Sequence, residues 1–141
     1  MPDAPDSAHL AAGLRQSLVR VVRRMRATRG FPLPQAAVLH HLDRLTSTSI
    51  GELASHERVR PQSMAQTVGE LEALGLVQRS PDPTDGRRVL LTLTAQGTAS
   101  LEEERRQRDD WLASAIEEQL DDAERAALAI AIPALSRIAD T

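Results

Sequence analysis

Cysteine and lysine are absent from this sequence of 141 residues, aromatic side chains are nearly absent, and no long apolar run occurs. Without cysteine the chain cannot form disulfides, sense redox state through a thiol or build a cysteine-rich zinc site. No apolar stretch approaches the ~20 residues that a membrane-spanning helix needs. The N-terminal segment lacks the basic start and apolar core of a secretory signal. We therefore expect a cytoplasmic protein with no membrane association.

Only two aromatic residues occur, Phe31 and Trp111. Proteins that bind RNA or single-stranded DNA stack bases on aromatic side chains, so this composition disfavours those modes of binding. It does not prevent folding, because leucine, valine, isoleucine and alanine are sufficient for a helical core. We interpret Trp111 as a packing residue rather than as part of a cofactor site, and we expect no cofactor.

Charge is distributed unevenly along the chain. Residues 1–30 contain six Arg and two acidic residues, residues 95–141 contain five Arg and eleven acidic residues, and the segment 56–94 is balanced. The net charge of −3 argues against a protein that binds nucleic acid through bulk charge alone. A chain of this length is expected to form one domain, residues 1–141.

The two ends of the chain carry apolar residues at helical spacing. After an irregular start, apolar residues recur every three or four positions and predict a helix over about 7–28. A second long helix is predicted from Thr94, its N-cap, to about Glu118, with an exposed and charged middle. Asp121 and Glu124 open a last helix, which Pro133 is expected to kink or divide. Because these helices are apolar on one stripe, we expect residues 7–30 and 95–141 to form a dimerisation bundle.

Between these ends, the chain has the signals of three shorter helices. Pro34 suits the first turn of a helix that ends near Leu45. Ser49 and Glu52 are spaced as a capping box, in which each side chain bonds the other's backbone N–H, and they open a short helix. Pro61 starts a third helix, which Gly75 ends. The predicted inner positions of the first and third helices are Ala37, Val38, His41, Leu42, Leu45, Met64, Val68, Leu71 and Leu74.

The third of these helices, residues 61–74, has a polar outer side. Glutamine can bond adenine with two hydrogen bonds, and serine and threonine can bond several base edges. Two short helices joined by a turn are typical of a helix-turn-helix, whose second helix enters the major groove. We therefore place five residues of this helix and its start among the DNA-binding residues: Arg60, Gln62, Ser63, Gln66 and Thr67.

Two strand-like segments, residues 76–80 and 89–93, follow this helix and predict a hairpin. Their connection reads Asp82-Pro83-Thr84-Asp85-Gly86-Arg87-Arg88. An ordinary charged hairpin tip is one interpretation, since Asp-Gly favours a tight turn. The other places Arg87 in the DNA minor groove, where the potential is most negative, with Asp85 holding its guanidinium. In that interpretation Arg79 or Arg88 contacts phosphates.

Metal binding and catalysis have weak support in the sequence. His40, His41 and His56 are the candidate metal ligands. Adjacent histidines point about 100° apart on a helix, so His40 and His41 do not chelate one ion together. No HxxxH or HExxH pattern occurs, and we expect no metal site. The chain also lacks a phosphate-binding glycine loop and a nucleophile motif, so we do not expect an enzyme.

Taken together, the motifs of residues 7–139 resemble those of the multiple-antibiotic-resistance regulator (MarR) family of bacterial transcription factors. The charged tip followed by Leu-Thr-x-x-Gly is the specific part of the resemblance. The matching segments are Ile50-Gly51-Glu52-Leu53-Ala54, Gln66-Thr67-Val68, Leu71-Glu72-Ala73-Leu74-Gly75-Leu76-Val77-Gln78-Arg79, Asp82–Arg88 and Leu93-Thr94-x-x-Gly97.

The resemblance implies a mainly α fold with a small β-wing: a winged helix-turn-helix lobe over residues 31–94 and a helical dimerisation bundle. It implies a homodimer that binds double-stranded DNA at pseudo-palindromic operators and represses its own or neighbouring genes. Many members release DNA when a small, often phenolic or lipophilic anion binds between lobe and bundle. The absence of cysteine excludes the thiol-based peroxide sensors of the family, and the scarcity of aromatics leaves a phenol pocket without obvious walls.

The sequence therefore predicts a sequence-specific DNA-binding regulator of transcription, most simply a repressor. The alternative is a winged-helix module that contacts protein without binding specific DNA. The balanced charge of residues 56–94 keeps this alternative open. The salt dependence of binding distinguishes the two, because DNA contacts release counterions and give a steep slope.

Overall fold

The computed structural model describes residues 5–28 and 30–141, which form two compact units. One unit, here the lobe, comprises residues 30–105. The other, here the terminal unit, comprises residues 5–28 and 106–141. The predicted irregular start of the chain falls partly on residues 1–4, outside the described residues.

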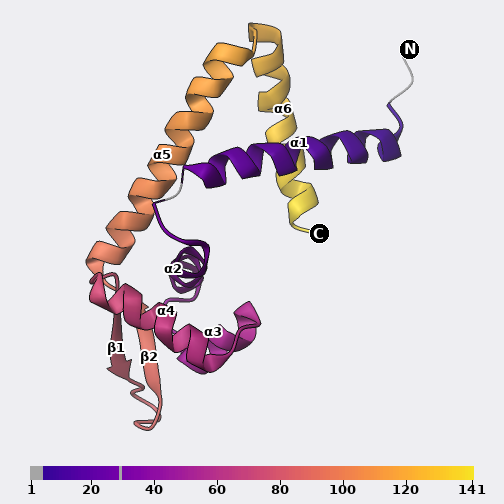
Figure 1. Ribbon diagram of the computed structural model, residues 1–141. Coiled ribbons are helices and arrows are strands. Elements are labelled where there is room, and N and C mark those ends of the chain that lie inside the picture. The colour runs from indigo at the N-terminus through magenta and orange to yellow at the C-terminus, as the bar shows by residue number, and fades with distance from the viewer. Residues whose placement is uncertain (1–4, 29) are drawn as a thin grey trace. The chain divides into compact units, whose positions relative to one another are not determined.

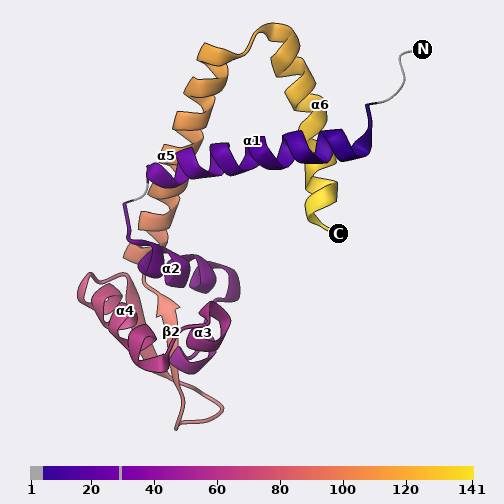
Figure 2. The same ribbon diagram turned by 45° about the vertical axis from the view of Figure 1, so that its right-hand side comes forward.

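The lobe contains three complete helices, a hairpin and the first turns of a further helix, and Figure 2 shows the three helices beside the strands. Strand β1 pairs antiparallel with β2, from Val77 opposite Leu93 to Pro81 opposite Val89. An isolated antiparallel bridge also pairs Thr48, just before α3, with Leu91 of β2. The mainly α fold with a β-wing that the sequence predicts is confirmed. The elements are α2 (Leu33–Leu45), α3 (Ile50–Glu57), α4 (Pro61–Ala73), β1 (Val77–Pro81) and β2 (Val89–Leu93).

The core of the lobe is aliphatic, and α4 supplies a large part of it. Met64, Val68 and Leu71 lie on one side of α4 at helical spacing and are buried. They pack against Leu39 and Leu42 of α2, together with buried residues of α3 and the hairpin. Burial of this apolar stripe holds α4 in place and leaves its opposite side accessible.

Two residues predicted to face the core do not. Leu45 is 55% exposed and Leu74 is 52% exposed, and each lies at the C-terminal end of its helix or just beyond it. The apolar spacing is correct for both, but the neighbouring elements do not extend far enough to cover them. Helical periodicity specifies a direction from the axis and not the extent of the packing partner.

The ends of the elements follow the local signals in the sequence. The Ser49 hydroxyl accepts the Glu52 N–H, and the Glu52 carboxylate accepts the Ser49 N–H, so the predicted capping box is confirmed. Asp121 and Glu124 form a second capping box. Gly75 has a φ of 74°, the left-handed conformation that ends a helix and favours glycine.

The start of α5 (Ala95–Gln119) is fixed to the end of the α4 segment. The Thr94 hydroxyl accepts the Gly97 N–H at 3.0 Å, as predicted for an N-cap, and donates to the Gly75 carbonyl at 2.6 Å. Gly97 is buried, and a Cβ there would lie 2.1 Å from the Leu76 carbonyl oxygen. Only glycine allows this approach, which accounts for the Leu-Thr-x-x-Gly pattern.

In the terminal unit, α1 (Ser7–Ala27) crosses α6 (Asp122–Ala139), and α6 follows the second half of α5 as a hairpin (Figure 1). No described residue of α1 or α6 is buried. Pro133 lies inside α6 without dividing it. Within the described residues, no helix has the length and apolar character needed to span a membrane.

The sequence predicted that the charged middle of α5 is exposed, and this prediction is wrong for Glu104. Glu104 is only 5% exposed, and its Oε2 lies 3.8 Å from Nε2 of His40 in α2. Arg105 pairs with Asp43 of the same helix α2 at 3.2 Å. The first turns of α5 thus belong to the lobe through ionic contacts to α2, which residue spacing along α5 alone does not reveal.

Candidate nucleic-acid interface

Helices α3 and α4 meet at a tight turn that sets the direction of α4. Arg58 closes α3 in the left-handed conformation with φ 54°, and Val59 donates its N–H to the Ala54 carbonyl at 3.0 Å. Arg60 then precedes α4 with extended backbone, and Pro61 occupies the first turn. Among residues 5–28 and 30–141, no side chain forms a capping hydrogen bond at the N-terminus of α4. Its free N–H groups and helix dipole therefore favour an anion at this end.

The outer side of α4 is polar, as predicted, and mostly accessible. Gln62, Ser63 and Gln66 are exposed, and Thr67 is half-buried. Thr67 donates its hydroxyl to the Ser63 carbonyl at 3.2 Å, so its donor is used within the helix. Within the described part of the chain, the side chains of Gln62 and Ser63 make no hydrogen bond. These two side chains are free to bond a ligand.

The tip of the wing is ordered by its own hydrogen bonds. Asp82 accepts the backbone N–H and the hydroxyl of Thr84 at 2.9 and 2.8 Å, and the N–H of Asp82 donates to the Arg88 carbonyl at 2.9 Å. The bonds from Thr84 lower the pKa of Asp82 below its usual value. The tip is therefore a shaped loop rather than a random connection.

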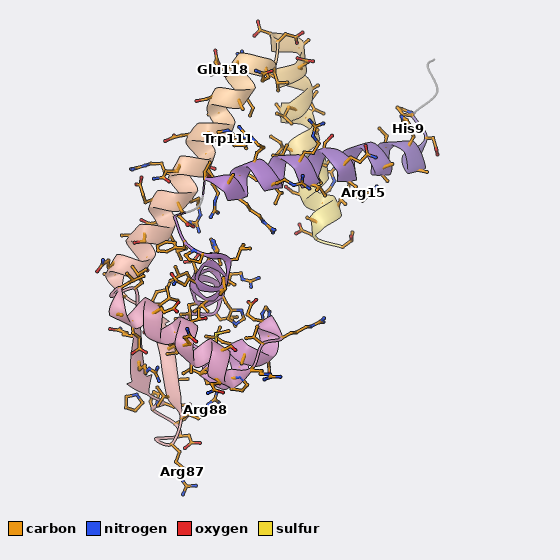
Figure 3. All side chains as sticks on the ribbon, viewed as in Figure 1. His9, Arg15, Arg87, Arg88, Trp111 and Glu118 are labelled. Atoms are coloured by element: carbon orange, nitrogen blue, oxygen red, sulfur yellow. The ribbon has the colours of Figure 1, made fainter. Side chains whose placement is uncertain are left out.

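Arg87 is exposed and projects beyond the end of the wing (Figure 3). Its backbone N–H donates to the Asp85 carboxylate at 3.1 Å. The predicted contact between Asp85 and the Arg87 guanidinium is absent from the described residues. Asp85 shapes the main chain at Arg87 instead, because a carboxylate two residues earlier reaches the nearer N–H first. The guanidinium stays available.

The other two arginines of the wing are held inside the lobe. Arg79 Nε donates to Glu72 Oε1 at 2.6 Å, and Arg88 pairs with Glu52, the capping residue of α3. Hydrogen bonds from the Thr48 hydroxyl, the Ser49 N–H and Arg88 lower the pKa of Glu52 to about 2. Both arginines remain partly exposed, but a phosphate has to compete with a carboxylate for each of them.

The sequence indicated the polar outer side of α4 and the charged wing tip, but not the acidic partners of the wing arginines. Glu52 is visible in the sequence as a capping residue, yet its contact with Arg88 joins positions 36 apart. Glu72 is the next-to-last residue of α4, and nothing in the sequence indicates that it reaches Arg79. No local pattern encodes such contacts, since they depend on how the hairpin folds back on α3 and α4.

Comparison with known proteins identifies the fold. A sequence profile described as the MarR family matches residues 29–88. An uncharacterised HTH-type transcriptional regulator of Mycobacterium leprae is 38% identical over 112 residues, which cover 74% of this chain and 76% of that protein. The chain belongs to the MarR family. The family predicted from the sequence motifs is thereby confirmed.

Two further similarities describe this MarR-family regulator more fully. A solved structure of a putative transcriptional regulator from Pseudomonas aeruginosa has a TM-score of 0.79 and 34% identity, and covers 98% of this chain and 99% of that one. An HTH-type transcriptional repressor of Mycobacterium tuberculosis is 39% identical over 70 residues, half of each chain. The family is one of DNA-binding transcriptional regulators rather than of enzymes, and the function predicted from the sequence is confirmed at that level.

Proposed function

We propose that this protein is a cytoplasmic, homodimeric repressor that binds a pseudo-palindromic operator through α4 and the wing of each protomer. The observation that carries the proposal is the accessible polar side of α4 beside a wing whose tip presents Arg87. A helix in this setting fits the major groove of B-DNA, and an extended arginine fits the adjacent minor groove.

Each predicted DNA-binding residue has a specific part in this proposal. Gln62, Ser63 and Gln66 read base edges, because their side chains are exposed on the outer side of α4. Thr67, half-buried, contributes packing at the edge of the contact, and Arg60 contacts phosphate at the start of α4. Arg87 enters the minor groove on the loop that Asp85 shapes. Arg79 and Arg88 contact phosphate by exchanging their carboxylate partners for it.

Dimerisation through the terminal unit is supported by its uncovered apolar surface. A groove of about 770 Å³ lies between α1 and α6. Apolar side chains dominate its lining, among them Leu10, Leu14, Leu18, Leu135 and Ile138. An exposed apolar surface of this kind is a usual mark of an association site. We propose that a second copy covers it and places two α4 helices about 34 Å apart, one helical turn of DNA.

An effector site is supported by a second groove in the terminal unit. It has a volume of about 310 Å³, and Arg20, Arg24 and Trp111 are among its five lining residues. Two guanidinium groups and one aromatic face suit a small organic anion. Trp111, interpreted from the sequence as a packing residue, thus also borders a groove. An anion that binds the two states with a difference of about 1–3 kcal/mol would change operator affinity roughly 5- to 150-fold.

The test of the proposed function is a titration of the purified protein against the DNA upstream of its own gene. Scrambled DNA of the same length is the control, and each titration is run at two salt concentrations. A tight, salt-sensitive preference for the upstream fragment supports the proposal. Equal, weak binding to both fragments, followed by no enriched sequence in a selection from random duplexes, contradicts it and favours the protein-interaction module.

A further inference from the structure

Three polar side chains of the lobe gather where α2 lies beside the end of α3. They are His41 of α2 and the consecutive residues His56 and Glu57 at the C-terminal end of α3. The imidazole rings of the two histidines lie with their centroids 4.3 Å apart, tilted by 60°. One ligand atom from each of the three residues lies within 4.8 Å of the others.

His41 is unusual among the core residues of α2. It is 3% exposed, while its neighbours on the same side of the helix, Val38 and Leu42, are aliphatic. Its Nδ1 is buried and makes no hydrogen bond to any residue that the structure describes. Burying such a polar atom without a partner costs free energy, and buried ring nitrogens are normally bonded or bound to metal. Nδ1 of His41 therefore has no bonding partner among the described residues, and an ion from solution can supply one.

The other two residues offer ligand atoms at the edge of the same cluster. His56 Nδ1 lies 3.4 Å from Glu57 Oε1. A tetrahedral zinc ion with nitrogen and oxygen ligands at about 2.0–2.2 Å has ligand atoms roughly 3.4 Å apart. The His56 and Glu57 side chains are 55% and 29% exposed, so they can adjust toward His41 and admit an ion from solvent.

We propose that His41, His56 and Glu57 bind one divalent transition-metal ion, of the zinc class, in each protomer. Two imidazoles and a carboxylate are a usual donor set for zinc, with a fourth position left for water.

Such an ion would join α2 to the turn that precedes α4. Glu57 is the last residue of α3, and only Arg58, Val59 and Arg60 separate it from Pro61 at the start of α4. The metal would therefore stabilise the lobe at the point where the direction of the DNA-reading helix is set. Because an ion that binds only the folded state adds to its stability, thermal unfolding should shift upward with zinc concentration.

The experiment is a zinc titration of the full-length protein, free of any histidine tag and stripped with chelator, by calorimetry and by thermal unfolding. Cobalt is the second probe, because tetrahedral coordination intensifies its visible absorption. The variants are His56→Gln and Glu57→Gln, which change accessible side chains. His9→Gln, an exposed histidine of α1, is the matched control.

We expect one zinc ion per protomer, a tetrahedral cobalt spectrum and an upward shift of the unfolding midpoint. Loss of an outer-shell partner weakens metal sites about 10–100-fold, so loss of a direct ligand in either variant should weaken zinc affinity by more than about 100-fold. His9→Gln should bind as the wild type does. The proposal is overturned if the wild type binds no zinc at micromolar concentrations, or if either ligand variant binds as tightly as the control.

Discussion

The two units of this protein differ in where their apolar side chains lie. In the lobe, leucines such as Leu39, Leu53 and Leu71 are essentially inaccessible. In the terminal unit, α1 and α6 have no buried described residue, and Ile130 is 79% exposed. Both units have helices with regular apolar stripes. In the lobe these stripes pack into a closed core, whereas in the terminal unit they remain exposed on the surface. A stripe indicates that a helix needs a partner, and not whether that partner lies in the same chain.

The largest expected effect comes from placing a charge in the terminal groove. Leu18 is 46% exposed and lines the groove between α1 and α6. Leu18→Glu should convert the dimer to monomer, because an interface would have to bury the carboxylate. Loss of bivalent binding should then lower operator affinity by about 10²–10⁴-fold. Sedimentation and DNA titration measure the two effects.

Leu45→Glu is the matched control, since Leu45 is a comparably exposed leucine (55%) in the lobe. It should remain dimeric. If Leu18→Glu also remained a dimer with unchanged operator affinity, the terminal groove would not be the dimer interface.

For the free energy of unfolding, the larger effect is expected in the lobe rather than in the terminal unit. Leu71→Ala removes side-chain volume from a closed core and should lower the free energy of unfolding by about 2–5 kcal/mol. Ile130→Ala removes an accessible side chain and, outside any interface, should change it by about 0.5 kcal/mol or less. Denaturant unfolding at fixed protein concentration measures both. If Ile130→Ala lowered the free energy of unfolding as much as Leu71→Ala does, this would show that the dimer covers α6 at Ile130 as well as at the groove.

A third comparison lies within the wing. Arg87 has no carboxylate on its guanidinium among the described residues, whereas Arg79 is bonded to Glu72. Hydrogen bonds to charged groups contribute about 1.5–3 kcal/mol, so Arg87→Ala should weaken operator binding roughly 10- to 100-fold at fixed salt. Arg79→Ala should cost less, because freeing its guanidinium breaks an existing ion pair. Equal losses in the two variants would contradict this assignment.

The smallest effect concerns acid stability of the lobe. Glu52 has a pKa of about 2 in the folded protein, against 4.5 as its ordinary value. Folding therefore favours the ionised form of Glu52, and the ionised carboxylate stabilises the folded protein. This stabilisation is present above pH 4.5 and is lost as the pH falls toward 2. The difference in unfolding midpoint between the wild type and Glu52→Gln should narrow across that window. A constant difference would show that the Glu52 contacts do not stabilise the fold.

What the sequence predicted well depends on residues close together in the chain. The capping box at Ser49, the helix stop at Gly75 and the polar side of α4 each follow from a few neighbouring residues. The DNA-binding roles of the α4 and wing residues stay predictions. The charged wing tip followed by Leu-Thr-x-x-Gly then indicated the family, which the comparisons confirm.

What the sequence did not predict depends on contacts between distant segments. Three features each depend on residues at least 15 positions apart: the pairing of Arg88 with Glu52, the burial of Glu104 beside α2, and the contact of His41 with His56. His40 and His41 have different neighbours, Glu104 and His56, as their adjacent positions on one helix predict. Nothing near Glu57 in the sequence indicates that α2 lies alongside it.

The buried glycine at position 97 has a mechanical consequence. Its Cα lies directly against the Leu76 carbonyl, with no side chain in between, and Thr94 bonds the carbonyl of Gly75 beside it. Elements that pack through side chains can move slightly against each other, because rotamers adjust by small amounts. Two main chains in direct contact cannot adjust in this way. The base of α5 and the residues that follow the C-terminal end of α4 are therefore rigidly connected. If α5 tilts at this point, α4 therefore has to rotate with it.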